Sequence, residues 1–333
     1  MEIMVSIICP IYNEERFIDA CIRSVLAQDF PKENWELLLV DGGSTDRTRA
    51  LIEPYLERYA NIRLLNNDHR TAPYAMNIGI RAAKGEYICR IDAHSTFPTN
   101  YVSTLLRYIS ELPDATNVGG VCQTLPANDS RKAQAISIAC SHPLGVGNST
   151  FRTATIDKPT EADTVPFGFW HRSLFDEIGF FDEELTRNQD DEFNARTIQH
   201  GGHIYLVPSI CTTYYARDTI RKTRSMFYQY GLFKPLVNSK IHHPATIRQF
   251  VPMLFMLGLI IGLPLCFLHT ALWITYVSII GLYLLFISLV GCTYRNAYLP
   301  IVFATIHLSY GIGYLHGIGK LLFKRPFNVE TNR

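Results

Sequence analysis

The stretch GEYICRIDAHS, residues 85–95, decides how the chain is interpreted. The apolar run from Tyr87 to Ile91, broken by one arginine, predicts a short buried strand. The run stops at Asp92-Ala93-His94, which presents a carboxylate and an imidazole two residues apart. Such an ending is either an ordinary turn or the edge of a binding site. The rest of the sequence has to decide between these two interpretations.

The first part of the chain alternates between strand-like and helix-like patterns. Short apolar runs predict strands at residues 5–10, 37–40, 62–65 and 87–91, and amphipathic spacing predicts helices at 16–28, 48–59 and 72–83. Strand–helix units in succession imply an α/β fold, in which helices flank both faces of a Rossmann-like, mostly parallel sheet.

Every predicted strand of this series is followed by polar, turn-forming residues, at 12–14, 41–43, 66–68 and 92–94. Carboxylates recur in these clusters. Parallel strands end at a common edge, and in open α/β sheets ligands bind beyond the carboxyl ends of the strands. The pattern therefore favours a binding site over an ordinary turn at Asp92-Ala93-His94.

Composition excludes some classes of protein. The formal net charge of the 333 residues is +1, so no global field gathers nucleic acid. None of the eight cysteines forms a C-x-x-C pair, which leaves zinc ribbons and dithiol redox motifs unsupported. We interpret the cysteines as reduced thiols facing a cytoplasm.

The C-terminal part is apolar enough to enter a membrane. Residues 250–268 and 271–290 are nearly free of charge and long enough to cross a hydrocarbon core, and residues 298–322 are a third candidate weakened by His307, His316 and Lys320. Lysines and arginines flank both ends of the region, so both ends are expected in the cytoplasm, which requires an even number of crossings. Either the third tract lies in the interface or is re-entrant, or one of the other tracts does not span.

Five motifs, in the order in which they occur along the chain, resemble those of glycosyltransferase family 2. The first two are Cys9-Pro10-Ile11-Tyr12-Asn13-Glu14-Glu15, similar to P-x-Y-N-E-E, and residues 40–46, similar to V-D-D/G-G-S-x-D. The others are Asn77-Ile78-Gly79 through Gly85-Glu86-Tyr87, residues 179–183 and the helix-like segment 189–196. The resemblance covers about residues 4–235. The Asp-Ala-His variant and the apolar tail further resemble the succinoglycan-type exopolysaccharide glucosyltransferases.

The resemblance implies a GT-A fold and inverting transfer of a sugar from a nucleotide donor. It implies that Asp190 is the general base and that Asp92 holds a divalent cation, Mn²⁺ or Mg²⁺, against the diphosphate. The residues that it places at the donor are Pro10, Tyr12, Glu14, Asp41, Asn77 and Asp92. On the acceptor side it places Trp170, His171 and Gln189, although Trp170 is equally interpreted as a core residue.

Two positions depart from the family pattern. His94 stands in place of the second aspartate of D-x-D, and imidazole suits Mn²⁺ better than Mg²⁺. His94 is therefore a metal ligand, a donor to a phosphate, or a residue that only shapes the turn. Gln189 replaces the glutamate that usually precedes the base.

These expectations combine into a membrane-anchored, metal-dependent enzyme. Residues 1–235 are expected to form a cytoplasmic GT-A domain, 236–249 a juxtamembrane linker and 250–325 a membrane domain in the inner membrane. The expected reaction transfers a hexose from a UDP-sugar to a polyprenyl-linked saccharide during synthesis of a surface glycan. Glucose is the first choice for this hexose. One alternative is a polyprenyl-phosphate sugar synthase. An alternative of another class is a catalytically silent binding subunit of a glycan-assembly complex.

Overall fold

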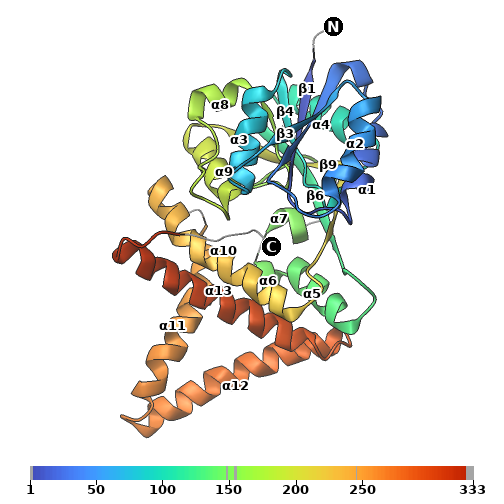
Figure 1. Cartoon of the computed structure of the whole chain (residues 1–333). Helices are drawn as coiled ribbons and strands as arrows, with labels where there is room; N and C mark the ends of the chain where they lie inside the picture. Colours follow the sequence, from blue (N-terminus) through green and yellow to red (C-terminus); the bar gives the residue numbers. More distant parts are fainter. Residues whose placement is uncertain (1–2, 148, 154–155, 245, 328–333) are drawn as a thin grey trace. The chain divides into compact units, whose positions relative to one another are not determined.

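The computed structural model describes residues 3–147, 149–153, 156–244 and 246–327, and these divide into two compact units. Unit 1 holds residues 3–123 and 150–214, and unit 2 holds residues 124–149 and 215–327, apart from those outside the described ranges. Figure 1 shows a sheet with helices in unit 1, and helices alone in unit 2.

Unit 1 is built on a single sheet that contains nine strands among the described residues, in the order β3-β2-β1-β4-β8-β6-β9-β5, with β7 pairing to β9. The strands are β1 (Val5–Ile11), β2 (Trp35–Asp41), β3 (Ile62–Asn66), β4 (Tyr87–Arg90), β5 (Ser95–Thr96), β6 (Ala115–Leu125), β7 (Thr160–Glu161), β8 (Phe169–His171) and β9 (His203–Tyr215). The first four are parallel, and β8, which pairs with β4 and β6, is antiparallel to both.

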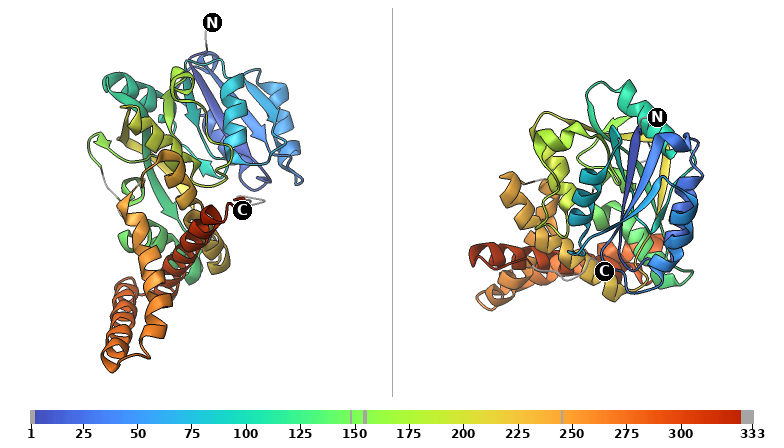
Figure 2. Two further views of the ribbon diagram at one scale, coloured as in Figure 1. Left: turned by 90° about the vertical axis from the view of Figure 1, so that its left-hand side faces the viewer. Right: turned by 45° about the horizontal axis from the view of Figure 1, so that its top comes forward.

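The helices of unit 1 cover both faces of this sheet, as Figures 1 and 2 show. Their bounds are α1 (Ile18–Leu26), η1 (Lys32–Asn34), α2 (Thr48–Arg58), α3 (Ala72–Ala82), α4 (Tyr101–Glu111), α7 (Thr150–Thr153), α8 (Ser173–Ile178) and α9 (Gln189–Gln199). Alternate residues of a strand face opposite sides. Ile7 and Cys9 of β1 accordingly pack with α1, α2 and α4, whereas Ile8 packs with α3, α8 and α9.

The expected series of strands and helices in the first part of the chain is confirmed, with ends that differ by only a few residues. The expectation of a mostly parallel sheet holds for β1 to β4. The later strands add antiparallel pairs, β4–β8, β5–β9 and β7–β9, so the whole sheet is mixed.

Unit 2 contains helices α5 (Arg131–Ser141), α6 (Pro143–Val146), α10 (Ile220–Ile241), η2 (Ile247–Gln249), α11 (Phe250–Leu265), α12 (Thr270–Thr293) and α13 (Leu299–Leu322). Within the described residues, three segments are long and apolar enough to cross a membrane: Ile247–Leu265, Thr270–Thr293 and Leu299–Leu322. They correspond to the three tracts expected from the sequence.

The compact units do not follow the expected boundary at residue 235. Residues 124–149 and 215–235, expected in the first domain, belong to unit 2. The physical reason is that α5, α6 and α10 pack on α13 rather than on the sheet. A linker at residues 236–249 is not a separate body either, because its first residues complete α10 and Ile247–Gln249 form η2.

Candidate active site

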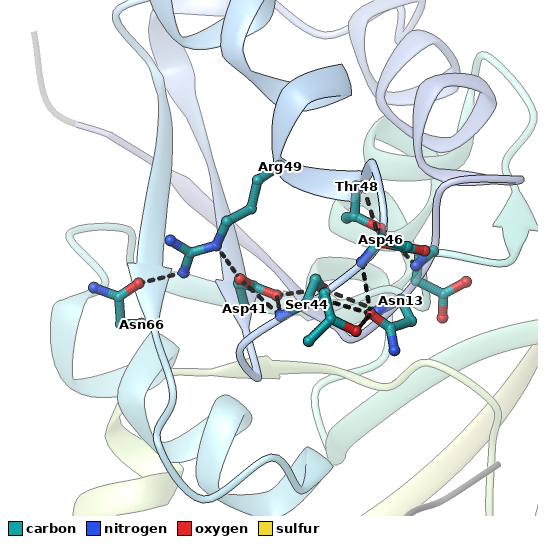
Figure 3. Close-up of polar contacts among 9 residues, drawn as sticks. Asn13, Asp41, Ser44, Asp46, Thr48, Arg49 and Asn66 are labelled. Atoms are coloured by element: carbon teal, nitrogen blue, oxygen red, sulfur yellow. Dashed lines mark hydrogen bonds and ion pairs between the residues drawn. The ribbon is translucent and has the colours of Figure 1, made fainter.

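The loops after β1 and β2 are tied together by side-chain hydrogen bonds (Figure 3). Asn13 has a left-handed backbone, with φ +55°, which asparagine tolerates better than most residues. Its Oδ1 accepts from the backbone N–H of Thr45 at 2.8 Å, and its own N–H donates to Ser44 Oγ at 2.9 Å. The N–H of Glu14 donates to Thr48 Oγ1 at 2.7 Å. The cluster expected at this edge of the sheet is therefore a rigid, cross-linked pair of loops.

Asp41, at the end of β2, is a buried acid that holds the loops at this edge of the sheet. Its carboxylate is fully buried, accepts from Ser44 Oγ at 2.6 Å and forms an ion pair with Arg49, which also donates to Asn66 Oδ1 at 2.6 Å (Figure 3). The carboxylate thus joins the ends of β2 and β3. Its contact with a nucleotide base remains a prediction, as do the donor contacts of half-buried Pro10 and Tyr12.

Glu14 and Asp92 converge although they follow different strands. The pKa of the buried Cys9 thiol is raised well above its ordinary value by a hydrogen bond with Cys21, by burial, and by the charges of Asp92 and Glu14. Both carboxylates therefore lie close to the same thiol in β1. Glu14 Oε1 is also 3.5 Å from His94 Nδ1. The ends of β1 and β4 thus bring together the two acids and the imidazole.

Arg90, the arginine inside the strand β4, lies between the two acids on which the predicted chemistry depends. Its Nη2 is 3.3 Å from Asp92 Oδ1, and its side chain is only 11% exposed. Burial alone lowers the pKa of Arg90, but Asp92 and Asp190 outweigh this and raise it above its ordinary value. Arg90 and Asp190 also line one small cavity. Arg90 therefore contacts Asp92 and shares a small cavity with Asp190, whose charge acts on the same guanidinium.

Asp190 is the second residue of α9, and its half-buried side chain lines this cavity. Asn188, just before the helix, has φ +60°, and Asp190 Oδ1 accepts the N–H of Asp191 at 3.1 Å. Glu192 is engaged elsewhere, because its Oε1 accepts from Arg196 Nε at 2.7 Å. Gln189 is 7% exposed. The consecutive acids of α9 therefore serve different purposes.

Trp170 is a core residue, which corrects its expected place on the acceptor side. The ring is 3% exposed and packs edge-on against Phe175, Phe181 and Phe193, with centroids about 6 Å away. It borders the cavity shared by Arg90 and Asp190, which has a volume of about 10 Å³, room for little more than one water. A sugar ring therefore finds no open indole face here.

His171 lies at the wrong edge of the sheet for the expected acceptor contact. Because β8 runs antiparallel to β4, His171 pairs with Tyr87, at the amino end of the strand that Asp92 follows at the carboxyl end. Its ring contacts Ser173 Oγ at 2.8 Å and Glu86 Oε1 at 3.3 Å. Sequence order gave no sign of this strand direction.

Asn77 also has a different role from the expected one. It is 1% exposed, its Oδ1 accepts the N–H of Phe181 at 3.0 Å, and its Nδ2 donates to Phe181 O and to Glu183 Oε1 at 2.9 and 2.8 Å. The amide therefore fastens α3 to the segment before α9. These bonds occupy both amide hydrogens, so Asn77 positions that segment rather than the donor.

Asp92 and His94, at the end of β4, are chemically suited to hold a divalent cation, which would need further ligands from outside the protein. Asp92 offers a carboxylate that is 24% exposed, and His94 offers Nδ1, a buried nitrogen with no hydrogen-bond partner among the described residues. A carboxylate with an imidazole suits Mn²⁺. No group of three or more His, Cys, Asp or Glu side chains able to hold a metal occurs in the described part of the chain. The protein would therefore supply only a minority of the ligands.

Arg90 is the principal site residue that the sequence did not reveal. One signal was available, because a charged residue inside a buried strand requires a charged partner. Arg49 was missed for another reason. It lies on the exposed side of α2, where an arginine is unremarkable until the turn at Asp41 is folded beside it.

Proteins of known name resemble this chain over most of its length. A glycosyltransferase from Methanococcus voltae, named dolichyl N-acetyl-α-D-glucosaminyl phosphate 3-β-D-2,3-diacetamido-2,3-dideoxy-β-D-glucuronosyltransferase, is 33% identical over 243 residues, which cover 71% of this chain and 74% of that relative. The succinoglycan biosynthesis protein ExoA of Rhizobium meliloti is 28% identical over 261 residues, 74% of each chain.

Solved structures show the same fold. The mannosyltransferase PcManGT of Pyrobaculum calidifontis, solved with GDP-Man and Mn²⁺, superposes with a TM-score of 0.59 at 15% identity, over 96% of this chain and 88% of that one. Residues 1–349 of TarS from S. aureus, solved with UDP-GlcNAc, give a TM-score of 0.51 at 15% identity, over 98% and 93%. The expected GT-A fold is thereby confirmed.

A family model described as glycosyl transferase family 2 matches residues 6–179, more than half of the chain, and this range contains β2 to β4 and all but the first residue of β1, with Asp92 and Arg90. The chain belongs to glycosyltransferase family 2.

Proposed function

We propose that this protein is a membrane-bound, inverting glycosyltransferase that moves a hexose from a UDP-sugar to a saccharide carried on a polyprenyl lipid. Glucose is the first choice of hexose, and an exopolysaccharide or related surface glycan is the proposed product. The observation that carries the proposal is the convergence of Asp92 and Asp190 on Arg90. The relatives' names support the acceptor class, because one acts on a dolichyl phosphate-linked sugar and another in succinoglycan biosynthesis.

The proposed chemistry assigns the two acids different roles. The acceptor hydroxyl loses its proton as it attacks the anomeric carbon, and Asp190 accepts that proton. Attack from the face opposite the departing diphosphate inverts the configuration in one displacement. A divalent cation held by Asp92 and His94 would neutralise the charge on the diphosphate. Arg90 keeps Asp92 and Asp190 at a fixed separation.

The proposed location is the cytoplasmic face of an inner membrane. Lysines and arginines flank the apolar helices of unit 2, which is the pattern of cytoplasmic segments. We keep the proposal that residues 1–235 include the whole catalytic machinery, although part of that range belongs to unit 2.

The test is transfer of label into lipid. Membranes containing the full chain are incubated with labelled UDP-glucose, UDP-GlcNAc or GDP-mannose, with Mn²⁺, Mg²⁺ or EDTA, and with either polyprenyl phosphate or a polyprenyl diphosphate-linked saccharide. The expected result is label in the saccharide lipid, from UDP-glucose alone and only with a metal. Label on polyprenyl phosphate instead would favour the sugar-phosphate synthase.

A chain that neither transfers nor hydrolyses any of these donors would refute the enzyme proposal and favour a binding subunit. Asp190→Asn is the matched control, because it removes the proposed base without changing the size of the side chain.

A further inference from the structure

The three membrane-length helices differ in how much of their surface is covered. Only 6% of the apolar window of α11 and 11% of that of α12 is buried, whereas 44% of that of α13 is buried. The large apolar side chains that α12 exposes include Trp273, Leu282 and Phe286, whereas on α13 Val302, Phe303 and Ile306 are fully buried. Helices α11 and α12 follow one another as a hairpin (Figure 2, left), whereas α13 packs against α5, α6 and α10 as well as against both helices of the hairpin.

One of these covering helices, α10, touches α13 at backbone distance. A Cβ on Gly313 would lie 2.1 Å from Tyr228 O, and a Cβ on Gly317 would lie 2.3 Å from Leu232 O. Because both helices advance by four residues between these two contacts, they run side by side in the same direction. Asn238 Nδ2 also donates to Tyr314 Oη at 2.9 Å. The two helices therefore form one closely packed pair.

Helix α10 is not suited to the interior of a bilayer. It is outside the set of candidate spans, and it carries five cations along its length, Arg221, Lys222, Arg224, Lys234 and Lys240. If α13 crossed the membrane in this packing, α10 would be drawn into hydrocarbon beside it. Charged side chains at bilayer depth are strongly disfavoured.

Polar groups from α5 and α6 contact the first half of α13 as well. His307 Nε2 contacts the carbonyl oxygen of Leu144 in α6 at 2.7 Å, and the ring of His142 lies 5.5 Å from that of Phe303. At its start, Asn296 Nδ2 donates to the carbonyl oxygen of Arg131 in α5 at 2.9 Å. Helices α5 and α6 therefore occupy positions that lipid would fill around a spanning helix.

The charges at the helix ends favour the same arrangement. Arg248 precedes α11, Arg295 follows α12, and Lys324 and Arg325 follow α13, whereas residues 266–269 between α11 and α12 contain no lysine or arginine. With two crossings, all of these cations stay on one side of the bilayer. With three, Lys324 and Arg325 would be on the side opposite Arg248, against the positive-inside rule.

We propose that the chain crosses the membrane twice, through the hairpin of α11 and α12, and that α13 lies in the plane of the membrane surface with α10. Residues 247 and 324 are then on one side of the bilayer, and residue 269 is on the other. The partner of this surface is an anionic bilayer, because residues 124–149 and 215–327 contain thirteen lysines and arginines but only two acids. The inference is independent of the proposed reaction.

Cysteine labelling from each side of the membrane tests this arrangement. Cys211 and Cys292, the exposed thiols in the described part of the chain, are first changed to serine. Single cysteines are then placed at Ile247→Cys, His269→Cys and Lys324→Cys, all exposed positions outside the cores of both units. Sealed vesicles of both orientations are treated with a membrane-impermeant maleimide, and Ile247→Cys defines the near side.

The proposal expects positions 247 and 324 to be labelled from one side and position 269 from the other. Labelling of 324 together with 269 would establish three crossings and overturn it. Labelling of all three positions from one side would show that the hairpin does not cross, which also overturns it. Detergent-solubilised samples, in which each cysteine must label, exclude a folding defect as the cause of a negative result.

Discussion

The two units of the chain carry opposite charge. Residues 1–123 and 150–214 hold 17 lysines and arginines against 27 acids, a formal charge of −10, whereas residues 124–149 and 215–327 hold 13 against two, a charge of +11. The net charge of +1 for the whole chain hides this division. The excess of acidic residues in unit 1 suits the binding of a cation. The excess of basic residues in unit 2 suits a surface that contacts anionic lipid.

The difference shows that the two units use their lysines and arginines differently. In unit 1 the cations at the site, Arg49 and Arg90, are engaged with Asp41 and Asp92 and so fix the geometry of carboxylates. In unit 2 thirteen lysines and arginines face only two acids, and at the proposed membrane surface each cation would contribute about 1 kcal/mol of attraction to an anionic bilayer. Substitutions in unit 1 should therefore change chemistry, and substitutions in unit 2 should change stability and membrane association.

The largest effect is expected from Asp190→Asn. Loss of the proposed general base should lower kcat for transfer by about 10²–10⁴-fold, while the affinity for the donor stays the same. The measurements are labelled-lipid formation and equilibrium binding of the nucleotide sugar. Asp191→Asn, on the next residue of the same helix, is the matched control and should retain activity within a few-fold. Equal losses in both variants would show that α9 needs its charge but not a base at 190.

Arg90→Leu should cause the next largest change. It removes the guanidinium that pairs with Asp92. Breaking a fully buried pair destabilises a protein by about 3–5 kcal/mol, and because Asp92 is 24% exposed the loss here should lie toward or below the lower end of that range. Thermal unfolding of the purified protein measures this loss. Arg90→Lys, which keeps the charge, should lose less. The exposed pair of Arg23 with Asp19 provides the control, and Arg23→Leu should leave unfolding unchanged.

Gly313→Ala tests the packing of unit 2. The new methyl group would meet the backbone of Tyr228, so α10 and α13 must separate, at an expected cost of about 1–3 kcal/mol. Gly319→Ala lies on the same helix with nothing within 4 Å of the added Cβ, and it should be neutral or slightly stabilising. Protease resistance and thermal unfolding of unit 2 compare the two. Identical behaviour would show that the α10–α13 contact does not hold this unit together.

The smallest effect concerns pH and His142, which caps α6 by accepting the N–H of Leu144 at Nδ1. Burial lowers the pKa of His142 below its ordinary value of 6.5. The folded state then binds fewer protons than the unfolded state. The free energy of unfolding should therefore be highest above about pH 6.5 and should decrease as the pH falls toward 5. His142→Asn keeps an acceptor but removes the titration. Melting curves at pH 7.5 and 5.5 should show a smaller loss in this variant than in the wild type.

The fold of unit 1 was largely predictable because its signals are local. Apolar runs punctuated by proline, glycine and acids located β1 to β4 and α1 to α3. The direction of β8 was not predictable, because it depends on pairing with β4, more than 80 residues earlier. The same is true of α5 and α6, whose sequence does not reveal that they pack on α13, at the other end of the chain.

The site was predictable where residues follow parallel strands and not elsewhere. Glu14 and Asp92 lie at the same edge of the sheet, since β1 and β4 are neighbours, and the charges of both acids act on the Cys9 thiol. Trp170 and His171 were misplaced because strand direction decides which way each side chain faces and at which edge it lies. The role of Arg90 depends on Asp190, 100 residues away, and needed the folded chain. The three interpretations of His94 remain, with Nδ1 now placed 3.5 Å from Glu14 Oε1.

Within residues 3–327 the chain passes between the two units three times, near residues 123, 149 and 214. Cutting the chain before α11 would therefore not release a self-sufficient soluble enzyme. It would leave α5 and α6 joined to β6 by the chain but without α13, so the surfaces of α5 and α6 that pack on α13 would be open to water. A water-soluble form suited to crystallisation would need two operations: replacement of residues 124–149 by a short linker, and a stop close after residue 214.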